Sequence, residues 1–279
     1  MILSQEYLGR VRAAAPLVHC ITNYVTVNDV ANALLAVGAS PVMSDEPDDV
    51  ADIAGLASAL VLNIGTLNSR SVEAMFAAGR VANARGIPIV LDPVGAGASR
   101  MRTETARRIL CELRVSAIRC NLSELKALSA DATASENAAA GSASATRGVD
   151  AAVADAVTEA NLPQVEASLM AFARECGCLV AVTGAIDVVC DGSRAIAIRG
   201  GRPEMARVTG TGCQLSAICA AFLAANPGKG LEALAAAVAS MDEAGETAWS
   251  RMRPGDGNAT YRDRIIDALY NMGAQAALR

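Results

Sequence analysis

The sequence predicts an α/β protein in which a mostly parallel central sheet is covered by helices on both faces. Short runs of consecutive apolar residues, which suit buried parallel strands, alternate along most of the chain with longer segments of helical periodicity. The connections between these segments are short, and no linker divides the chain. We therefore expect residues 1–279 to form a single domain.

The first half of the chain shows this alternation clearly. Residues 4–15 have the pattern of an amphipathic helix with Ser4 as its cap and Pro16 as its stop. Glycine is common directly after a helix, and Gly38 and Gly86 end predicted helices in this way. The helices expected here span 4–15, 27–37, 48–57, 71–85 and 103–113, and the apolar runs between them predict strands over 17–21, 40–43, 60–64, 87–91 and 115–120.

The second half begins with an irregular segment. Residues 129–161 are rich in alanine, serine, glycine and acids with little aliphatic patterning, which predicts a loosely packed or mobile peripheral segment. A helix over 164–175 and a strand over 179–182 follow, and Asp191-Gly192-Ser193 between two apolar runs predicts a hairpin over 187–198. A further helix starts near Cys213, and the chain from Leu231 onward is predicted to be helical except at 254–257.

The composition excludes several classes of protein. Hydrophobic residues make up 52% of the 279, enough for a large core, and the net charge of −5 provides no basic surface for nucleic acid. No stretch reaches the roughly 18 uninterrupted apolar residues of a membrane span, and the first residues lack the pattern of a signal peptide. We therefore expect a cytoplasmic protein with reduced cysteines and no nucleic-acid or membrane partner.

A glycine-containing loop predicts an anion site. Gly210, Thr211 and Gly212 directly precede an apolar helical segment, where exposed backbone N–H groups and the helix dipole can hold a phosphate. Cys213 comes next, and the same dipole is expected to lower the pKa of its thiol. The alternative interpretation is a tight turn into a core helix with a small buried cysteine.

Polar side chains also gather where the predicted strands end. In parallel sheets, ligands bind beyond the carboxyl ends of the strands, although each such residue alone could be a cap or a turn former. Asp92 and Glu124 are suitable carboxylates for Mg²⁺, Arg119 has the forked geometry that matches phosphate, and Thr183 adds a hydroxyl group. Together these residues suit phosphoryl transfer from a nucleotide.

Other chemistry has less support in the sequence. His19, the only histidine, lies between apolar neighbours and is expected to be a hydrogen-bonded, half-buried side chain. With one histidine and the spacing Cys176-Gly177-Cys178, a structural metal site is not expected. Neither a Walker lysine loop nor a dinucleotide glycine fingerprint follows a first strand.

Five segments resemble the hydroxyethylthiazole kinase family. They are Pro16-Leu17-Val18-His19-Cys20-Ile21-Thr22-Asn23, Gly38-Ala39-Ser40-Pro41-Val42-Met43, Asn63-Ile64-Gly65-Thr66-Leu67, Asp92-Pro93-Val94-Gly95-Ala96-Gly97 and Val208-Thr209-Gly210-Thr211-Gly212-Cys213. They occur in the family's order between about residues 16 and 225. Segment 129–161 and Gly255-Asp256-Gly257-Asn258 match the family less well.

The resemblance implies a ribokinase-like three-layer fold and transfer of the ATP γ-phosphate to the hydroxyl group of 4-methyl-5-(2-hydroxyethyl)thiazole, a step in thiamine salvage. It also implies Mg²⁺ and a homotrimer with thiazole pockets at the subunit boundaries. By motif, Asn23, Met43 and Gly210 fall on the thiazole side, Arg119 and Thr183 on the ATP side, and Asp92 and Glu124 near the metal and phosphates. Cys213 stands where related sugar and pyrimidine kinases have an aspartate base.

Three alternative functions remain open at this point. A second small-alcohol kinase, such as hydroxymethylpyrimidine kinase, fits the fold, but Cys213 in place of aspartate argues against it. A nucleotide-binding regulatory protein without turnover is disfavoured by the presence of both carboxylates and the full glycine loop. A cysteine acyl-transferase would pair Cys213 with His19, but the sequence identifies no acid that would orient that histidine.

Overall fold

The computed structural model describes residues 2–129 and 156–273. It contains one eight-stranded sheet with the strand order β2-β1-β3-β4-β5-β6-β7-β8. Strands β1 to β6 are parallel, and β7 and β8 continue the sheet as an antiparallel hairpin. The strands are β1 (Leu17–Ile21), β2 (Ser40–Met43), β3 (Ala59–Asn63), β4 (Ile89–Asp92), β5 (Ala117–Cys120), β6 (Leu179–Val182), β7 (Asp187–Cys190) and β8 (Ala195–Ile198).

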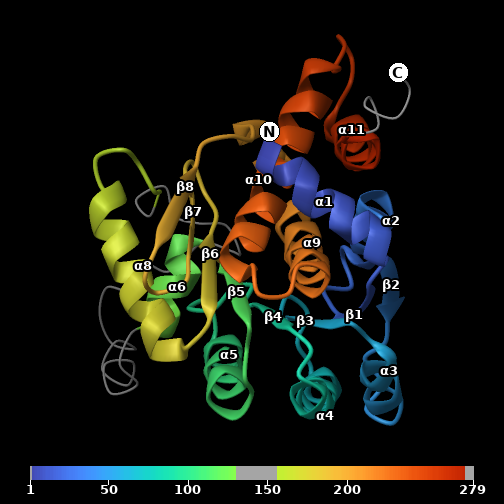
Figure 1. Ribbon diagram of the computed structural model, residues 1–279, viewed down its shortest axis with the longest axis vertical. Coiled ribbons are helices and arrows are strands. Elements are labelled where there is room, and N and C mark those ends of the chain that lie inside the picture. Colours follow the sequence, from blue (N-terminus) through green and yellow to red (C-terminus); the bar gives the residue numbers. More distant parts are fainter. Residues whose placement is uncertain (1, 130–155, 274–279) are drawn as a thin grey trace.

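Helices cover both faces of this sheet and make three layers (Figure 1). One face packs against α1 (Ile2–Ala14), α2 (Val27–Val37), α9 (Thr211–Ala225), α10 (Gly230–Ser250) and α11 (Asn258–Asn271). The other packs against α3 (Val50–Leu56), α4 (Ser69–Arg85), α5 (Arg100–Glu112), α6 (Leu122–Ser129) and α8 (Leu162–Cys176). A 3-10 helix, η3 (Pro203–Arg207), links β8 to the loop before α9.

The apolar strands owe their pattern to burial on both faces. In β3, for example, Val61 belongs to the core on the α9 side, whereas Leu60 and Leu62 belong to the core on the α4 side. The predicted α/β class, the mostly parallel sheet and the hairpin are confirmed. Gly38 and Gly86 end α2 and α4 in the left-handed conformation, as expected.

Several boundaries differ from the prediction. Helix α1 begins at Ile2, so Ser4 does not precede it, and α5 begins at Arg100 because Ser99 accepts a hydrogen bond from the Arg102 amide. Helices α6 and η3 were not predicted. Most of the segment expected to pack loosely, residues 130–155, lies outside the described residues.

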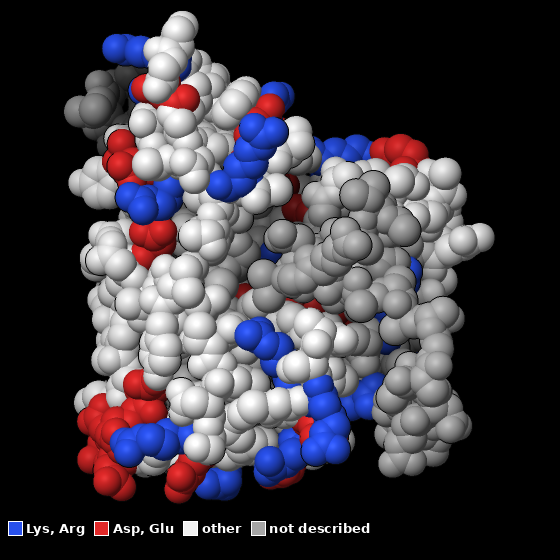
Figure 2. Space-filling model, turned by 180° about the vertical axis from the view of Figure 1, so that it is seen from behind, with Lys and Arg blue, Asp and Glu red and all other residues white. Residues whose placement is uncertain are grey.

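The described surface carries charges of both signs. Figure 2 shows Lys and Arg side chains next to Asp and Glu mainly along the lower edge and at the upper left of the face seen from behind, with a largely uncharged area between them. Exposed ion pairs of the described residues include Arg108 with Glu112 and Arg70 with Glu46. Among the described helices, none combines the length and the apolar character that crossing a membrane requires.

Candidate active site at the carboxyl ends of β3 to β6

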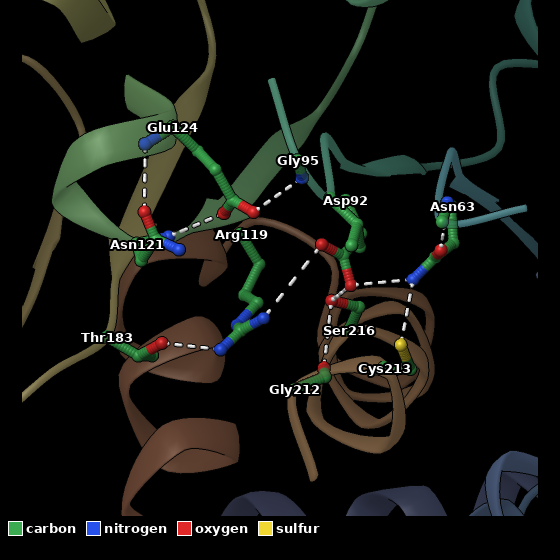
Figure 3. Close-up of polar contacts among 12 residues, drawn as sticks. Asn63, Asp92, Gly95, Arg119, Asn121, Glu124, Thr183, Gly212, Cys213 and Ser216 are labelled. Carbon is green, nitrogen blue, oxygen red and sulfur yellow. Dashed lines mark hydrogen bonds and ion pairs between the residues drawn. The ribbon is translucent and has the colours of Figure 1, made fainter. Parts of the chain in front are cut away.

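The site is centred on Asp92, the last residue of β4, which is completely buried. Its Oδ2 accepts hydrogen bonds from Asn63 Nδ2 at 2.8 Å and from Ser216 Oγ at 2.8 Å (Figure 3). Parallel pairing places Asn63 directly opposite Asp92, since each residue ends its strand. Ser216 lies one turn after Gly212 in α9, so the start of this helix faces the strand ends.

The second oxygen of Asp92 lacks such support. Oδ1 is buried without a hydrogen-bond partner among the described residues, and Arg119 Nη1 is 3.9 Å away. Burial raises the pKa of Asp92, while Arg119, Ser216 and Asn63 act in the opposite direction. A buried carboxylate oxygen with an unused lone pair is well suited to a bound cation.

Glu124 supplies a second buried carboxylate. Its Oε1 accepts the amide of Gly95 at 2.8 Å, and its Oε2 accepts the amide of Asn121 at 2.9 Å. Asn121 Oδ1 in turn accepts the amide of Glu124 at 2.8 Å, which makes a reciprocal cap at the start of α6. Burial, and then the charge of Asp92, raise the pKa of Glu124 to about 7.

These two carboxylates fit Mg²⁺. Within residues 2–129 and 156–273, no group of three or more His, Cys, Asp or Glu side chains is arranged around one metal position. Mg²⁺ typically takes one or two carboxylates and obtains its other ligands from water and phosphate. The unpartnered Oδ1 of Asp92 together with nearby Glu124 matches that preference.

Arg119 connects the carboxylates with the glycine loop. Its Nη2 donates to Thr183 Oγ1 at 2.5 Å. The guanidinium also lies against Gly212, where a Cβ atom would be only 2.4 Å from Nη1. Burial alone would lower the pKa of Arg119, but the charges of Asp92 and Glu124 raise it above the usual value. A fixed positive charge therefore lies directly beside the start of α9.

The glycine loop itself packs closely. Gly210 caps α9 in the left-handed conformation with φ of 85°, and a Cβ atom there would lie 2.3 Å from Thr26 Cγ2. The helix starts at Thr211, so the amides of Thr211, Gly212 and Cys213 belong to its first turn. First-turn amides have no partner within a helix and can hold an anion.

The environment of Cys213 differs from the prediction. Its sulfur accepts a hydrogen bond from Asn63 Nδ2 at 3.2 Å, and the residue is buried. Burial, and then the charge of Asp92, raise the pKa of this thiol to about 11, so the expected lowering by the helix dipole is wrong. Cys213 is therefore a neutral thiol near pH 7.

The residues assigned to the thiazole side are only partly brought together. Gly65 links Asn23 to Asn63, because the Gly65 amide donates to Asn63 Oδ1 at 2.9 Å and a Cβ on Gly65 would be 2.5 Å from Asn23 Nδ2. Met43 ends β2, beside Cys20 of β1, and is half-buried. Within the described part of the chain, no hydrogen bond joins Met43 to the cluster around Asp92.

His19 is buried more completely than expected. Its Nε2 is 2.8 Å from the Ser44 carbonyl oxygen, and burial lowers its pKa. Side chains alternate along a strand, so His19 lies on the opposite face of β1 from Cys20, which packs on the α9 side. The sulfur of Cys213 is bonded to Asn63 instead, which removes the basis for a cysteine acyl-transferase.

Sequence reasoning did not assign roles to Asn63, Ser216 or Gly95. Asn63 entered the prediction as the first residue of the segment Asn63-Ile64-Gly65-Thr66-Leu67, which resembles the family. The position of Ser216, four residues after Gly212 on the same helix, was a usable signal, because such pairs share a helix face. The amide of Gly95 could not be identified in advance, since any backbone amide has the same donor.

The chain is similar to known proteins along most of its length. Residues 8–275 match the model of the hydroxyethylthiazole kinase family. A hydroxyethylthiazole kinase from Clostridium acetobutylicum is 44% identical over 268 residues, which cover 96% of this chain and 94% of that protein.

Solved structures show the same similarity. The structure of a hydroxyethylthiazole kinase from Pyrococcus horikoshii OT3 has a TM-score of 0.80 and 37% identity, covering 97% of this chain and 94% of that one. A ribokinase-like superfamily protein from Enterococcus faecalis shares the fold alone, with a TM-score of 0.63 and 13% identity over 96% of this chain and 93% of that one.

Proposed function

The chain belongs to the hydroxyethylthiazole kinase family and is thus a phosphotransferase of ribokinase-like fold; we propose that the cluster around Asp92 is its active site. There the γ-phosphoryl group of ATP passes to the hydroxyl group of 4-methyl-5-(2-hydroxyethyl)thiazole. One observation carries the assignment of the site. The guanidinium of Arg119 lies against Gly212 in the first turn of α9 and 3.9 Å from the unpartnered Oδ1 of Asp92.

The two sides of the site have different tasks. Arg119 and the first-turn amides of α9 hold the phosphates, and Thr183 fixes the orientation of the guanidinium. Asp92 and Glu124 are the residues that would hold Mg²⁺. When bound, this ion would neutralise negative charge on the phosphates.

Transfer proceeds by direct in-line attack. The hydroxyl oxygen forms a bond to the γ-phosphorus, the bond from phosphorus to the bridging oxygen breaks, and ADP leaves. The proton leaves the alcohol late in a loose transition state, so orientation counts for more than base strength. The Asn63-bound sulfur of Cys213 orients the hydroxyl group, with the thiol as its hydrogen-bond partner.

The thiazole pocket is completed by a neighbouring subunit. Asn23 is followed by Tyr24 and Val25, which are 55% and 68% exposed although both have large apolar parts. Met43 lies on the neighbouring strand β2, at one edge of the sheet. Because exposed apolar residues beside a binding site favour a further partner surface, a homotrimer closes the pocket. Sedimentation of a fully active monomer would remove this part of the proposal.

The proposal also covers the domain organisation and the cellular location of the protein. The chain acts as one domain, which is supported by the eight strands of the described residues, since they all join one sheet. Its location is the cytoplasm, which is supported by the eight free cysteines, the state expected in a reducing compartment.

A coupled ADP-release assay tests the proposal. ADP should form when the thiazole alcohol, ATP and Mg²⁺ are all present. Its formation should stop when a chelator removes the metal. Faster turnover of a hydroxymethylpyrimidine than of the thiazole alcohol would assign the site to a different small-alcohol kinase. ATP binding without turnover of either alcohol would indicate a regulatory protein.

A further inference from the structure

Helix α5 begins with a charge pattern that its own dipole does not favour. Its first turn contains Arg100 and Arg102 and no acidic residue, although the positive end of a helix disfavours cations. The Arg100 side chain is 89% exposed and pairs with Glu104. Arg102 instead turns inward and is half-buried. A cation held at this position calls for another explanation.

The guanidinium of Arg102 binds the two loops that follow β3 and β4. Its Nη1 donates to the carbonyl oxygens of Ile64 at 3.3 Å and Val94 at 2.7 Å, and its Nη2 donates to that of Gly65 at 2.8 Å. These loops come directly after Asn63 and Asp92, the last residues of the two strands. Arg102 therefore joins the backbone behind the site.

Two of these contacts are made to peptide groups that also face the site. The carbonyl of Ile64 shares a peptide group with the Gly65 amide, which donates to Asn63. The carbonyl of Val94 shares one with the Gly95 amide, which donates to Glu124. A peptide group is planar, so fixing its oxygen fixes the direction of its N–H group. A charged donor on the oxygen also polarises the N–H group and strengthens its hydrogen bond.

We propose that Arg102 is a positioning residue for phosphoryl transfer, which orients Asn63 and Glu124 through the Ile64–Gly65 and Val94–Gly95 peptide groups. This inference rests on the proposed function. Asn63 passes the constraint on to Asp92 and Cys213, since its amide donates to both side chains. Arg102 touches no reacting atom and acts only through these residues.

The chain offers a matched control for a guanidinium that holds carbonyl groups together. Arg12 of α1 donates to the carbonyl oxygens of Met272 at 2.7 Å, Tyr270 at 3.0 Å and Leu269 at 3.3 Å. It lies close to Gly38 and thus near the amino end of β2, whereas Asp92 lies at the carboxyl end of β4. Arg12→Met removes the same number of contacts of similar length without reaching the site.

The experiment compares Arg102→Met, Arg102→Lys and Arg12→Met in the full-length chain. Active sites are counted by ADP titration, so that turnover refers to folded protein alone. Arg102→Met should lower kcat roughly 10- to 100-fold, the effect of a slight misplacement of reacting groups, with the KM for ATP changed by less than about 3-fold. Arg102→Lys should lie between it and the wild type, because one ammonium group cannot span three carbonyls. Arg12→Met should keep the wild-type kcat.

A second measurement does not depend on turnover. Iodoacetamide labelling of Cys213 is compared by peptide mass spectrometry with labelling of Cys219, which lies in the same helix and is completely buried. Local opening of the site exposes only the first cysteine, whereas global unfolding exposes both. The ratio of Cys213 to Cys219 labelling should rise at least several-fold in Arg102→Met and stay at the wild-type value in Arg12→Met.

The two measurements separate the possible failures. If the wild-type protein shows no turnover, the proposed function is removed. If the labelling ratio is nevertheless raised in Arg102→Met and not in Arg12→Met, the orientation of Asn63 by Arg102 is still supported. An active wild type whose Arg102→Met variant matches Arg12→Met in kcat and in labelling would overturn the proposal. In that case Arg102 only holds two loops together.

Discussion

The side-chain nitrogen of Asn63 lies 3.2 Å from the sulfur of Cys213 and donates a hydrogen bond to it. The same nitrogen donates to Asp92 Oδ2 at 2.8 Å. The side-chain amide of Asn63 therefore holds two groups in place: the Cys213 thiol, proposed to contact the alcohol, and the Asp92 carboxylate, proposed to bind the metal. Substitutions at either end of this contact can be predicted.

Cys213 is expected to matter through the hydrogen bond it offers to the alcohol. Cys213→Asp should keep turnover, since aspartate can also accept from Asn63 and from the hydroxyl group. Cys213→Ala should lose roughly 10²-fold in kcat, because a hydroxyl group that is no longer oriented reacts more slowly, and Cys213→Ser should fall between them. The kcat of each variant is measured at saturating ATP. A phospho- or acyl-cysteine in the intact mass would contradict direct transfer.

Asp92 and Glu124 are expected to support catalysis more than substrate binding. Asp92→Asn and Glu124→Gln should each lower kcat roughly 10²-fold or more. Each variant would hold Mg²⁺ less well, so the negative charge of the phosphates would be less neutralised. Glutamine can still cap α6, so the second variant should stay folded. The thiazole dissociation constant, measured by calorimetry, should change much less than kcat. Wild-type turnover in either variant would refute the metal assignment.

Gly212 is expected to be required because it has no side chain. In Gly212→Ala the new methyl group would lie 2.4 Å from Arg119 Nη1 and displace the guanidinium from Thr183 and Asp92. We expect kcat/KM for ATP to fall roughly 10-fold, the loss of about one charge-assisted hydrogen bond. Gly9→Ala is the control, since a Cβ at Gly9 would meet nothing within 4 Å. An unchanged kcat/KM for ATP would show that Arg119 does not hold the phosphates.

A pair of acids, the buried Asp187 and the half-buried Asp242, is expected to make stability depend on pH. Asp187 accepts the amide of Gly184 at 2.7 Å and shares a hydrogen bond with Asp242. Burial, and then the charge of Asp187, raise the pKa of Asp242 to about 8. The folded protein thus keeps a proton that the unfolded chain releases above its ordinary pKa of 3.8, so stability falls as pH rises from about 4 through 8.

Asp242→Asn should remove this dependence, because the amide is neutral and still donates to Asp187. At pH 8.5 the variant should be more stable than the wild type by roughly 1–3 kcal/mol, and at pH 5 the difference should largely vanish. Urea unfolding at the two pH values measures this, with Asp48→Asn at an exposed position as the control. A variant less stable than the wild type at pH 8.5 would contradict the shared proton.

Much of the fold was predictable because central strands such as β3 and β4 are buried throughout and lie next to glycines or prolines. Helix α6 was not predicted, since its eight residues are too few for a clear period and its start depends on the reciprocal cap of Asn121 and Glu124. The extra turn of α5 was missed although Ser99 is a suitable cap, because cationic Arg100 and Arg102 are not favoured in the first turn of a helix.

The site was predictable as a set of strand ends but not as a network. That Asn63 and Asp92 lie side by side follows only from the register of β3 and β4, which one sequence does not reveal. The pKa of Cys213 was predicted in the wrong direction because the dipole of α9 was considered without the burial of the sulfur and the charge of Asp92. The pairing of Asp187 with Asp242 joins β7 to α10 and had no signal in the sequence.

Helix α9 has a consequence for synthesis on the ribosome. It packs against β1, β3 and β4, yet it is made after all eight strands. At the usual elongation rates of about 5–20 residues per second, the apolar side of the sheet under α9 stays open for seconds while the nascent chain lengthens. Chains stalled before residue 211 should therefore be retained by chaperones that bind exposed apolar surface, and chains stalled with α9 and α10 outside the exit tunnel should be released from them.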